Sequence, residues 1–132
     1  LRAVGAGISA VVVHDDAGTL LDVVHVRTAV ADALELDVVT ATGRVPAPAP
    51  LELSVGEVVK LAVTPTRGGR RLGGDATATW SAAAEPDTGE PIGLNVEPNA
   101  PAVIEVTALT AGDSTLSASF ASIDAELRLV VR

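Results

Sequence analysis

The sequence has no cysteine, and aromatic residues make up only 2% of its 132 residues. Without cysteine the chain has no disulfide framework, no thiolate nucleophile and no thiolate metal site. Because aromatic residues are so scarce, valine, leucine, isoleucine and alanine must build the core, with Trp80 and Phe120 as its only large rings. Hydrophobic residues make up 48% of the chain and valine is abundant, so we expect a packed domain built from β-strands.

Long apolar runs and concentrated positive charge are also missing. No apolar run approaches the roughly 20 residues that a membrane-spanning helix needs, so no membrane insertion is expected within this segment. The net charge is −8 and the basic residues are scattered, which argues against a nucleic-acid partner. Basic residues gather only at Arg67, Arg70 and Arg71 around a Gly-Gly pair, and this pattern indicates a solvated turn more than an anion site.

The C-terminal part of the chain shows the clearest strand pattern. From Ile123 to Val131 the odd positions are apolar, and Asp124, Glu126 and Arg128 lie between them, which is the period of a half-buried strand. Residues 115–120 alternate in the same way, and the interval around Ser122 leaves room only for a short turn. We therefore predict a C-terminal β-hairpin.

Shorter alternating runs predict further strands, separated by stretches rich in glycine, proline and aspartate. These runs are residues 59–63, 76–80, 94–96 and 104–108, of which the last two form a pair. Residues 34–38 predict an opening strand, although residues 29–36 could also support a helical turn. The proline-rich segment 42–50 cannot sustain a ladder, because proline removes donors, and predicts a surface linker or an extended edge crossing. Short strands at this spacing indicate an all-β sandwich or barrel.

The chain also contains an internal echo at an offset of 105 residues, which places Gly7 over Gly112. Two stretches match at this same offset, with no gap needed in the alignment: residues 1–9 over 106–114, and residues 24–27 over 129–132. One sandwich module has about 100 residues. The echo therefore predicts that residues 1–27 are the C-terminal hairpin of a preceding module and that residues 28–132 form one complete module.

Three short segments follow one another in the larger part of the chain: Ser54-Val55-Gly56-Glu57, Trp80-Ser81 and residues 106–116. Together they resemble bacterial immunoglobulin-like domains of group 2. The resemblance covers about residues 51–132, with a partial copy at 1–27, and departs from the family at residues 98–101, where a tight glycine turn is usual. It implies an immunoglobulin-like β-sandwich of antiparallel strands in a secreted or surface-exposed bacterial protein. The family has no catalytic residues that could be assigned to positions of this sequence.

Trp80 is predicted to be a core ring, because it shares its alternation phase with Ala76 and Ala78. We expect Phe120 to cover it from the facing sheet. The alternative is that Trp80 is an exposed platform on which a sugar could stack.

The two histidines, His14 and His25, are the only side chains whose unperturbed chemistry suits a general base near neutral pH. If residues 16–18 turn the first hairpin, His14 pairs with Leu20 and His25 pairs with Ser9. The histidines then lie far apart, and we expect them to be surface residues that form neither a shared metal site nor a catalytic pair.

Asp15 and Asp16 stand next to a glycine turn and invite a calcium hypothesis. The alternating acidic ligands and the terminal glutamate of an EF-hand loop are missing, so an aspartate-rich turn is the preferred interpretation. No nucleophile elbow and no phosphate-binding glycine loop is present either. We therefore expect no catalytic, cofactor-binding or metal-binding residues.

The N-terminal hairpin differs from the C-terminal one, because residues 11–13, 20–21 and 23–24 put apolar side chains on both faces. A lone hairpin of this kind is only marginally stable. We expect it either to dock on the complete domain or to self-associate through its strand edges.

The function that the sequence favours is that of a non-catalytic structural or adhesion module, a spacer or presenting unit outside a bacterial cell. The expected partners are neighbouring immunoglobulin-like modules of the same chain, with a cell-surface protein or glycan as a further possibility. The alternatives are a carbohydrate- or calcium-binding module that uses Trp80, Asp15 and Asp16, and an accessory domain of a secreted enzyme.

Overall fold

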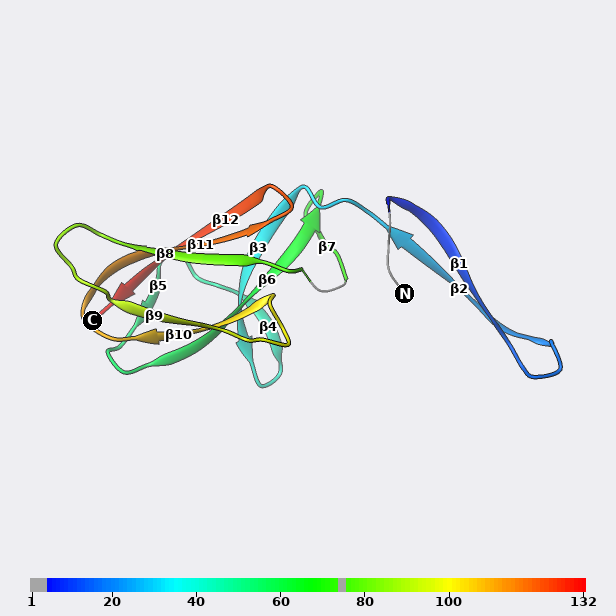
Figure 1. Ribbon diagram of the computed structural model, residues 1–132, viewed down its shortest axis with the longest axis horizontal. Helices are drawn as coiled ribbons and strands as arrows, with labels where there is room; N and C mark the ends of the chain where they lie inside the picture. The colour runs from blue at the N-terminus through cyan, green and yellow to red at the C-terminus, as the bar shows by residue number, and fades with distance from the viewer. Residues whose placement is uncertain (1–4, 74–75) are drawn as a thin grey trace. The chain divides into compact units, whose positions relative to one another are not determined.

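The computed structural model describes residues 5–73 and 76–132, and the regular elements in these ranges are all β-strands. Figure 1 shows their course along the chain. The strands are β1 Gly7–His14, β2 Leu20–Thr28, β3 Ala33–Thr40, β4 Gly43–Pro46, β5 Leu51–Leu53, β6 Val58–Arg67, β7 Arg70–Arg71, β8 Thr79–Ala84, β9 Ile92–Val96, β10 Val103–Ala108, β11 Gly112–Phe120 and β12 Ile123–Val131. Within the described ranges there is no helix that could cross a membrane.

The chain divides into two compact units, residues 1–31 and residues 32–132. The first unit holds the antiparallel hairpin of β1 and β2. The second unit holds all the other strands, in two sheets. Whether a complete module begins at residue 28, as the 105-residue offset suggests, stays a prediction.

The second unit is a sandwich of two mainly antiparallel sheets. One sheet has the strand order β4-β3-β6-β10-β9, with the short β7 paired to β6, and the other has the order β5-β12-β11-β8. When the seven main strands β3, β6, β8, β9, β10, β11 and β12 are lettered A to G in chain order, the sheets read A-B-E-D and C-F-G. This is the strand order of immunoglobulin constant-type domains, so the unit has an immunoglobulin-like fold.

The core lies between the two sheets and is almost entirely aliphatic. Its larger cluster joins Leu61, Ile104 and Val106 of the first sheet to Leu116 and Leu129 of the second, and all five side chains are fully buried. The aliphatic residues at alternate strand positions thus meet in the centre. Burying each such side chain contributes about 1.5–3 kcal/mol, which explains how the fold forms with two large rings and no disulfide.

The predicted C-terminal hairpin is confirmed. β12 has the predicted bounds, and β11 pairs with it along its whole length from Gly112↔Val131 to Phe120↔Ile123. The turn consists of Ala121 and Ser122, both with positive φ. Such a two-residue turn matches the right-handed twist of the two strands. The strand predicted at residues 34–38 is also confirmed, as part of β3, and the helical alternative is wrong.

The strand predicted at residues 76–80 is misplaced, because β8 begins only at Thr79 and runs on to Ala84. Its ladder partner decides this boundary: Ser119 of β11 pairs with Thr79, and β11 ends one residue later in the hairpin turn. Ala76 and Ala78 are buried outside the ladder. Trp80 therefore stands near the start of its strand and does not end it.

The prediction that the proline-rich segment 42–50 forms no ladder is wrong for its first half. Residues 43–46 form β4 and pair with β3 at the edge of the first sheet. Pro46 is tolerated because it ends an edge strand. After it the chain crosses to the second sheet, where β5 pairs with β12, so the segment is an edge crossing and no linker.

Candidate functional site

Trp80 lies on strand C of the sandwich, the strand that carries the core tryptophan of antibody domains. Its ring is half-buried and packs against both core clusters, and its indole Nε1 donates a 3.0 Å hydrogen bond to the carbonyl oxygen of Pro101. Val63 on strand B and Ala118 on strand F lie in the same cluster. Strands B, C and F thus meet in this cluster through apolar side chains.

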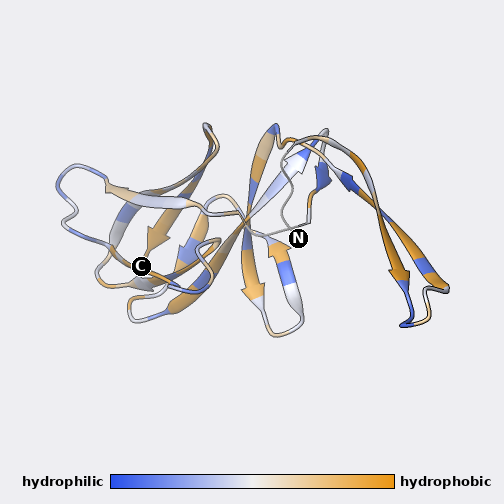
Figure 2. Ribbon diagram, turned by 45° about the vertical axis from the view of Figure 1, so that its right-hand side comes forward, coloured by the Kyte–Doolittle hydropathy of each residue, from blue (hydrophilic) through white to orange (hydrophobic). Residues whose placement is uncertain are grey.

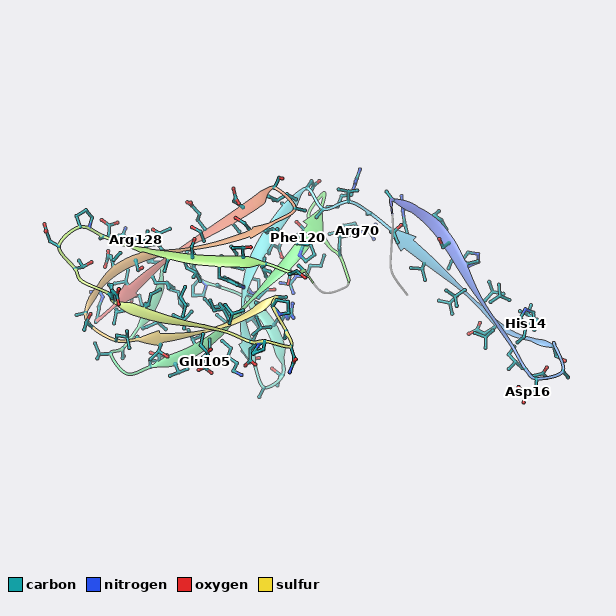
Figure 3. The ribbon with its side chains drawn as sticks, in the orientation of Figure 1. His14, Asp16, Arg70, Glu105, Phe120 and Arg128 are labelled. Atoms are coloured by element: carbon teal, nitrogen blue, oxygen red, sulfur yellow. The ribbon has the colours of Figure 1, made fainter. Side chains whose placement is uncertain are left out.

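Phe120 does not face Trp80 from the opposite sheet, and this expectation is wrong. It lies on β11, which is the direct neighbour of β8 in the same sheet, with Ala118 opposite Trp80. Figure 3 shows Phe120 at the end of its strand. Trp80 is instead held by its contacts with both core clusters and by its indole hydrogen bond to Pro101.

The acidic turn of the first hairpin is built on its own hydrogen bonds. The Asp15 Oδ1 oxygen accepts from the backbone nitrogens of Ala17 (2.9 Å) and Thr19 (2.8 Å), and the His14 ring lies 3.1 Å from the carbonyl oxygen of Gly18. Figure 3 shows His14 and Asp16 at this closed end. The Asp15 carboxylate thus stabilises the turn, in the way aspartate does in turns.

The pairing of β1 with β2 corrects one predicted position. His14 pairs with Leu20 as expected, but His25 pairs with Ala10 and not with Ser9. A bulge between Val13 and His14 shifts the register by one residue, which moves His25 to the other face of the hairpin. His14 and Ala10 are four residues apart on one strand, so the histidines are separated by about 13 Å along the hairpin.

The described ranges 5–73 and 76–132 contain no group of three or more histidine, aspartate or glutamate side chains that could hold a metal ion.

A buried carboxylate is the most unusual polar group of the second unit. The Asp37 side chain is fully buried, and its Oδ1 lies 2.5 Å from Arg71 Nη2 while its Oδ2 accepts a 2.8 Å hydrogen bond from the Thr64 hydroxyl. Arg71 also contacts Glu35, with 3.2 Å between Nε and Oε2, and Arg44 donates to Thr64. The carboxylate is therefore paired on both oxygens, as a buried charge must be.

This network was missed by sequence reasoning. Asp37 stands at an alternating position of β3 and looks like an ordinary outward-facing residue, and Arg71 looks like part of a solvated turn. They meet because β7 folds back and pairs with β6, and the Arg71 side chain then reaches across β6 to Glu35 and Asp37 on β3. The placement of an arginine shortly after a long strand is the sequence signal that could have indicated this ion pair, and it is weak. The turn itself is confirmed, with positive φ at Gly68 and Gly69.

Ion pairs also line the outer surface of the second unit. Lys60 Nζ lies 2.8 Å from Glu97 Oε1, and this hydrogen bond, together with the charge of Glu97, raises the pKa of Lys60 above its usual value. Arg128 pairs with Asp113, which raises the pKa of Arg128 in the same way. Both pairs are exposed, so each contributes little to stability.

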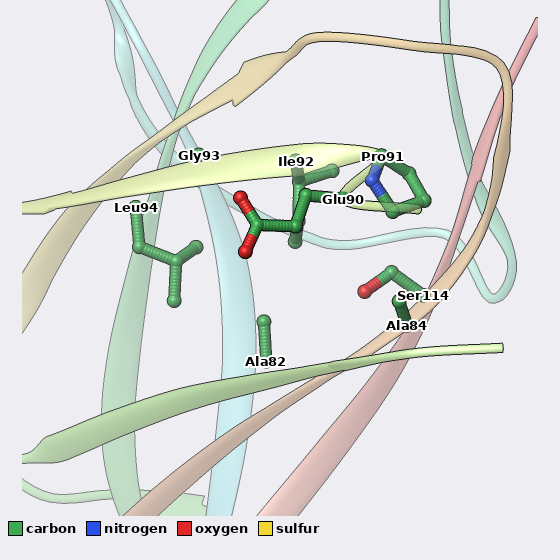
Figure 4. Close-up of a pocket in the computed structure, with 8 residues that line it drawn as sticks. All are labelled: Ala82, Ala84, Glu90, Pro91, Ile92, Gly93, Leu94 and Ser114. Atoms are coloured by element: carbon green, nitrogen blue, oxygen red, sulfur yellow. The ribbon is translucent and has the colours of Figure 1, made fainter. Parts of the chain in front are cut away.

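A small slot opens between the edge strands β8 and β9. Its volume is about 250 Å³, and Figure 4 shows the lining side chains. Ala82 and Ala84 form one wall, Ile92 and Leu94 form the other, and Glu90 points its carboxylate into the space. Cofactor and small-molecule pockets usually measure roughly 300–1,000 Å³, so this slot has room for one or two amino-acid side chains only.

No protein-family model and no curated protein matches the chain. Solved structures that it is similar to include domains 4 and 5 of the S-layer protein SbsC, with 11% identity and a TM-score of 0.48 over 96% of this chain and 65% of that one. An I-band fragment of titin is 20% identical with a TM-score of 0.36, over 64% of this chain and 30% of that one. The Dscam1 Ig7 domain is 11% identical with a TM-score of 0.40, over 76% of this chain and 97% of that one.

Proposed function

We propose that the chain is a non-catalytic stretch of tandem immunoglobulin-like modules from a secreted or surface-exposed bacterial protein, where it serves as a spacer or presenting unit. Residues 1–27 are then the closing hairpin of one module and residues 28–132 the whole of the next. The neighbouring modules of the same chain are its first partners, and a cell-surface protein or glycan is the target that the modules hold at a distance.

The observation that carries this proposal is the correspondence between the two hairpins. β1 begins at Gly7 and β11 begins at Gly112, which is the offset of 105 residues found in the sequence. Each of these strands is followed by its antiparallel partner, a strand of nine residues in both cases. The second strands begin at Leu20 and Ile123, an offset of 103, because the first hairpin has a longer turn and a register shifted by two residues. Two hairpins whose first strands begin at the spacing of one module are what a tandem array produces.

The faces of the two hairpins support the same conclusion. On β11 the side chains of Ser114, Leu116 and Ala118 are buried against the facing sheet. At the offset of 105 they correspond to Ser9, Val11 and Val13 on one face of β1. In the proposed array this face would pack on earlier strands of its own module.

Exposure of apolar side chains in the first hairpin fits a module that is completed elsewhere. Ile8 is 71% exposed, Leu21 is 63% exposed, and Val12 and Val24 are each 48% exposed. Figure 2 shows that hydrophobic residues cover most of both strands. A soluble two-stranded hairpin would not present such side chains on both faces, because contiguous apolar surface drives association.

Surface labelling tests the proposed location and role. Antibodies raised against residues 32–132 should label intact cells of the source organism, and brief protease treatment of those cells should remove the signal. Labelling that appears only after the cells are permeabilised would contradict a surface role. A spacer also predicts an elongated particle in small-angle scattering when two consecutive modules are expressed together.

The calcium and sugar alternatives have no specific observation in their favour. The Asp15 oxygen that would bind calcium is engaged in the turn, and Trp80 is held in the core by its indole hydrogen bond. Calcium titration monitored by thermal unfolding provides the check, because binding to the folded state would raise the unfolding temperature.

A further inference from the structure

Each sheet of the sandwich has two edge strands. On one side of the sandwich these are β8 and β9, and on the opposite side they are β4 and β5. The two sides differ in how their edge strands are protected. At the opposite side the edge strand β4 carries Arg44 and Pro46, and β5 is only three residues long and carries Glu52. Charges, proline and short length are devices that keep an edge strand from pairing with another chain. β8 and β9 contain neither a charged residue nor a proline.

β8 is the better acceptor of the two strands. It has six residues, from Thr79 to Ala84, and only one of its edges pairs with β11. Among the described strands none pairs with the other edge, which presents backbone donors and acceptors to solvent. Residues 82–84 are exposed alanines, whose small side chains do not block the approach of another strand. An extended peptide can add to such an edge by main-chain hydrogen bonds, with specificity from pockets that receive alternate side chains.

The slot beside β8 supplies such a pocket. Ile92 and Leu94 on β9 and the two alanines of β8 make its walls apolar, and its 250 Å³ suits an aliphatic side chain. The Glu90 carboxylate enters the same space (Figure 4). A strand that pairs with β8 directs every second side chain toward this slot, so it would place one residue near the apolar walls and the next inward residue near Glu90.

The charge around the slot selects the partner. The loop from β8 to β9 carries Glu85, Asp87 and Glu90, all exposed. Residues 32–132 contain 14 aspartates and glutamates against seven lysines and arginines, a net charge of −7, so the surrounding field adds to the effect of the loop.

We infer that the free edge of β8 and its slot bind an extended peptide segment in which basic residues alternate with aliphatic ones. The segment adds as a strand beside β8, sets an aliphatic side chain against Ile92 and Leu94, and pairs a lysine or arginine with Glu90. This inference stands independently of the proposed spacer function, because it rests on the second unit alone.

Fluorescence anisotropy with two labelled six-residue peptides, one alternating valine with lysine and the other alternating valine with glutamate, tests the inference. The full chain should bind the lysine peptide at least tenfold more tightly than the glutamate peptide. Ala82→Arg fills the slot and should weaken binding of the lysine peptide at least tenfold. Ala83→Arg is the matched control, because Ala83 is the exposed neighbour on the other face of β8 and does not line the slot, and it should bind like the wild type.

Glu90→Lys provides an independent variant, since it changes an exposed loop residue and leaves the slot walls intact. It should reverse the preference, so that the glutamate peptide binds more tightly than the lysine peptide. Equal binding by the Ala82→Arg and Ala83→Arg variants would place the peptide elsewhere, the first hairpin included, and would overturn the inference. Equal affinity of the wild type for both peptides, or no binding of either, would overturn it as well.

Discussion

The buried Asp37 carboxylate gives the sharpest test of how the second unit is held together. Replacing Arg71 by methionine keeps the aliphatic stem but removes the guanidinium that pairs with Asp37 and Glu35. Among residues 5–73 and 76–132, Asp37 then keeps one side-chain hydrogen bond, from Thr64, and loses its cationic partner. We expect the folded state to be destabilised, because a buried charge that loses its partner keeps its desolvation cost.

The magnitude follows from the exposure of the two partners. Removing one member of a fully buried pair costs about 3–5 kcal/mol. The Arg71 side chain is 40% exposed, so water can enter the vacated space and hydrate Asp37 in part. We therefore expect Arg71→Met to lower the free energy of unfolding by about 2–3 kcal/mol, which is a large part of the roughly 5–15 kcal/mol of a typical domain.

Urea denaturation followed by Trp80 fluorescence measures this change. A loss of about 2–3 kcal/mol should lower the urea midpoint by about 1–2 M at an unchanged slope. Arg70→Met is the control, because Arg70 is the exposed neighbour, and it should change the stability by less than about 0.5 kcal/mol. Adding Asp37→Val to Arg71→Met should recover stability, since no buried charge then remains. The reasoning is refuted if Arg71→Met and Arg70→Met have equal midpoints.

Three further predictions concern packing and boundaries. Trp80→Ala should cost about 3–5 kcal/mol through the cavity it leaves, and a loss below about 1 kcal/mol in chemical denaturation would contradict the core role. Gly112→Ala should destabilise by about 1–3 kcal/mol, because Gly112 has φ +152° and an added Cβ would meet the Thr88 side chain at 2.9 Å, whereas Gly7→Ala at the corresponding position of the first hairpin meets nothing and should be nearly neutral in thermal unfolding. Deleting residues 1–27 should leave residues 28–132 folded, equally stable and monomeric in sedimentation; a deletion variant that fails to fold would show that the hairpin belongs to one larger sandwich.

Strands with a regular alternation of apolar and polar residues could be predicted from the sequence. β12 has its predicted bounds because one face is apolar, the other is polar, and a shift of one residue would turn the apolar side chains to solvent. The same physics identifies β11, the hairpin turn between them, and the pair of β9 and β10. Composition alone was enough to predict an aliphatic core, because valine, leucine, isoleucine and alanine are the abundant apolar residues of this chain.

Which strands are neighbours, and in which register they pair, depends on the folded structure, and the missed features follow from these two properties. Phe120 lies beside Trp80 in one sheet because β11 pairs with β8, a pairing that alternation cannot specify. His25 changes face because of a bulge that no local signal marks. Asp37 finds its charged partner because the two-residue strand β7 sets Arg71 where its side chain reaches across β6, and the slot exists because the two sheets end in β8 and β9 on the same side. Alternation records which side of its own strand a residue occupies, whereas contacts between distant segments arise from the pairing and packing of whole sheets.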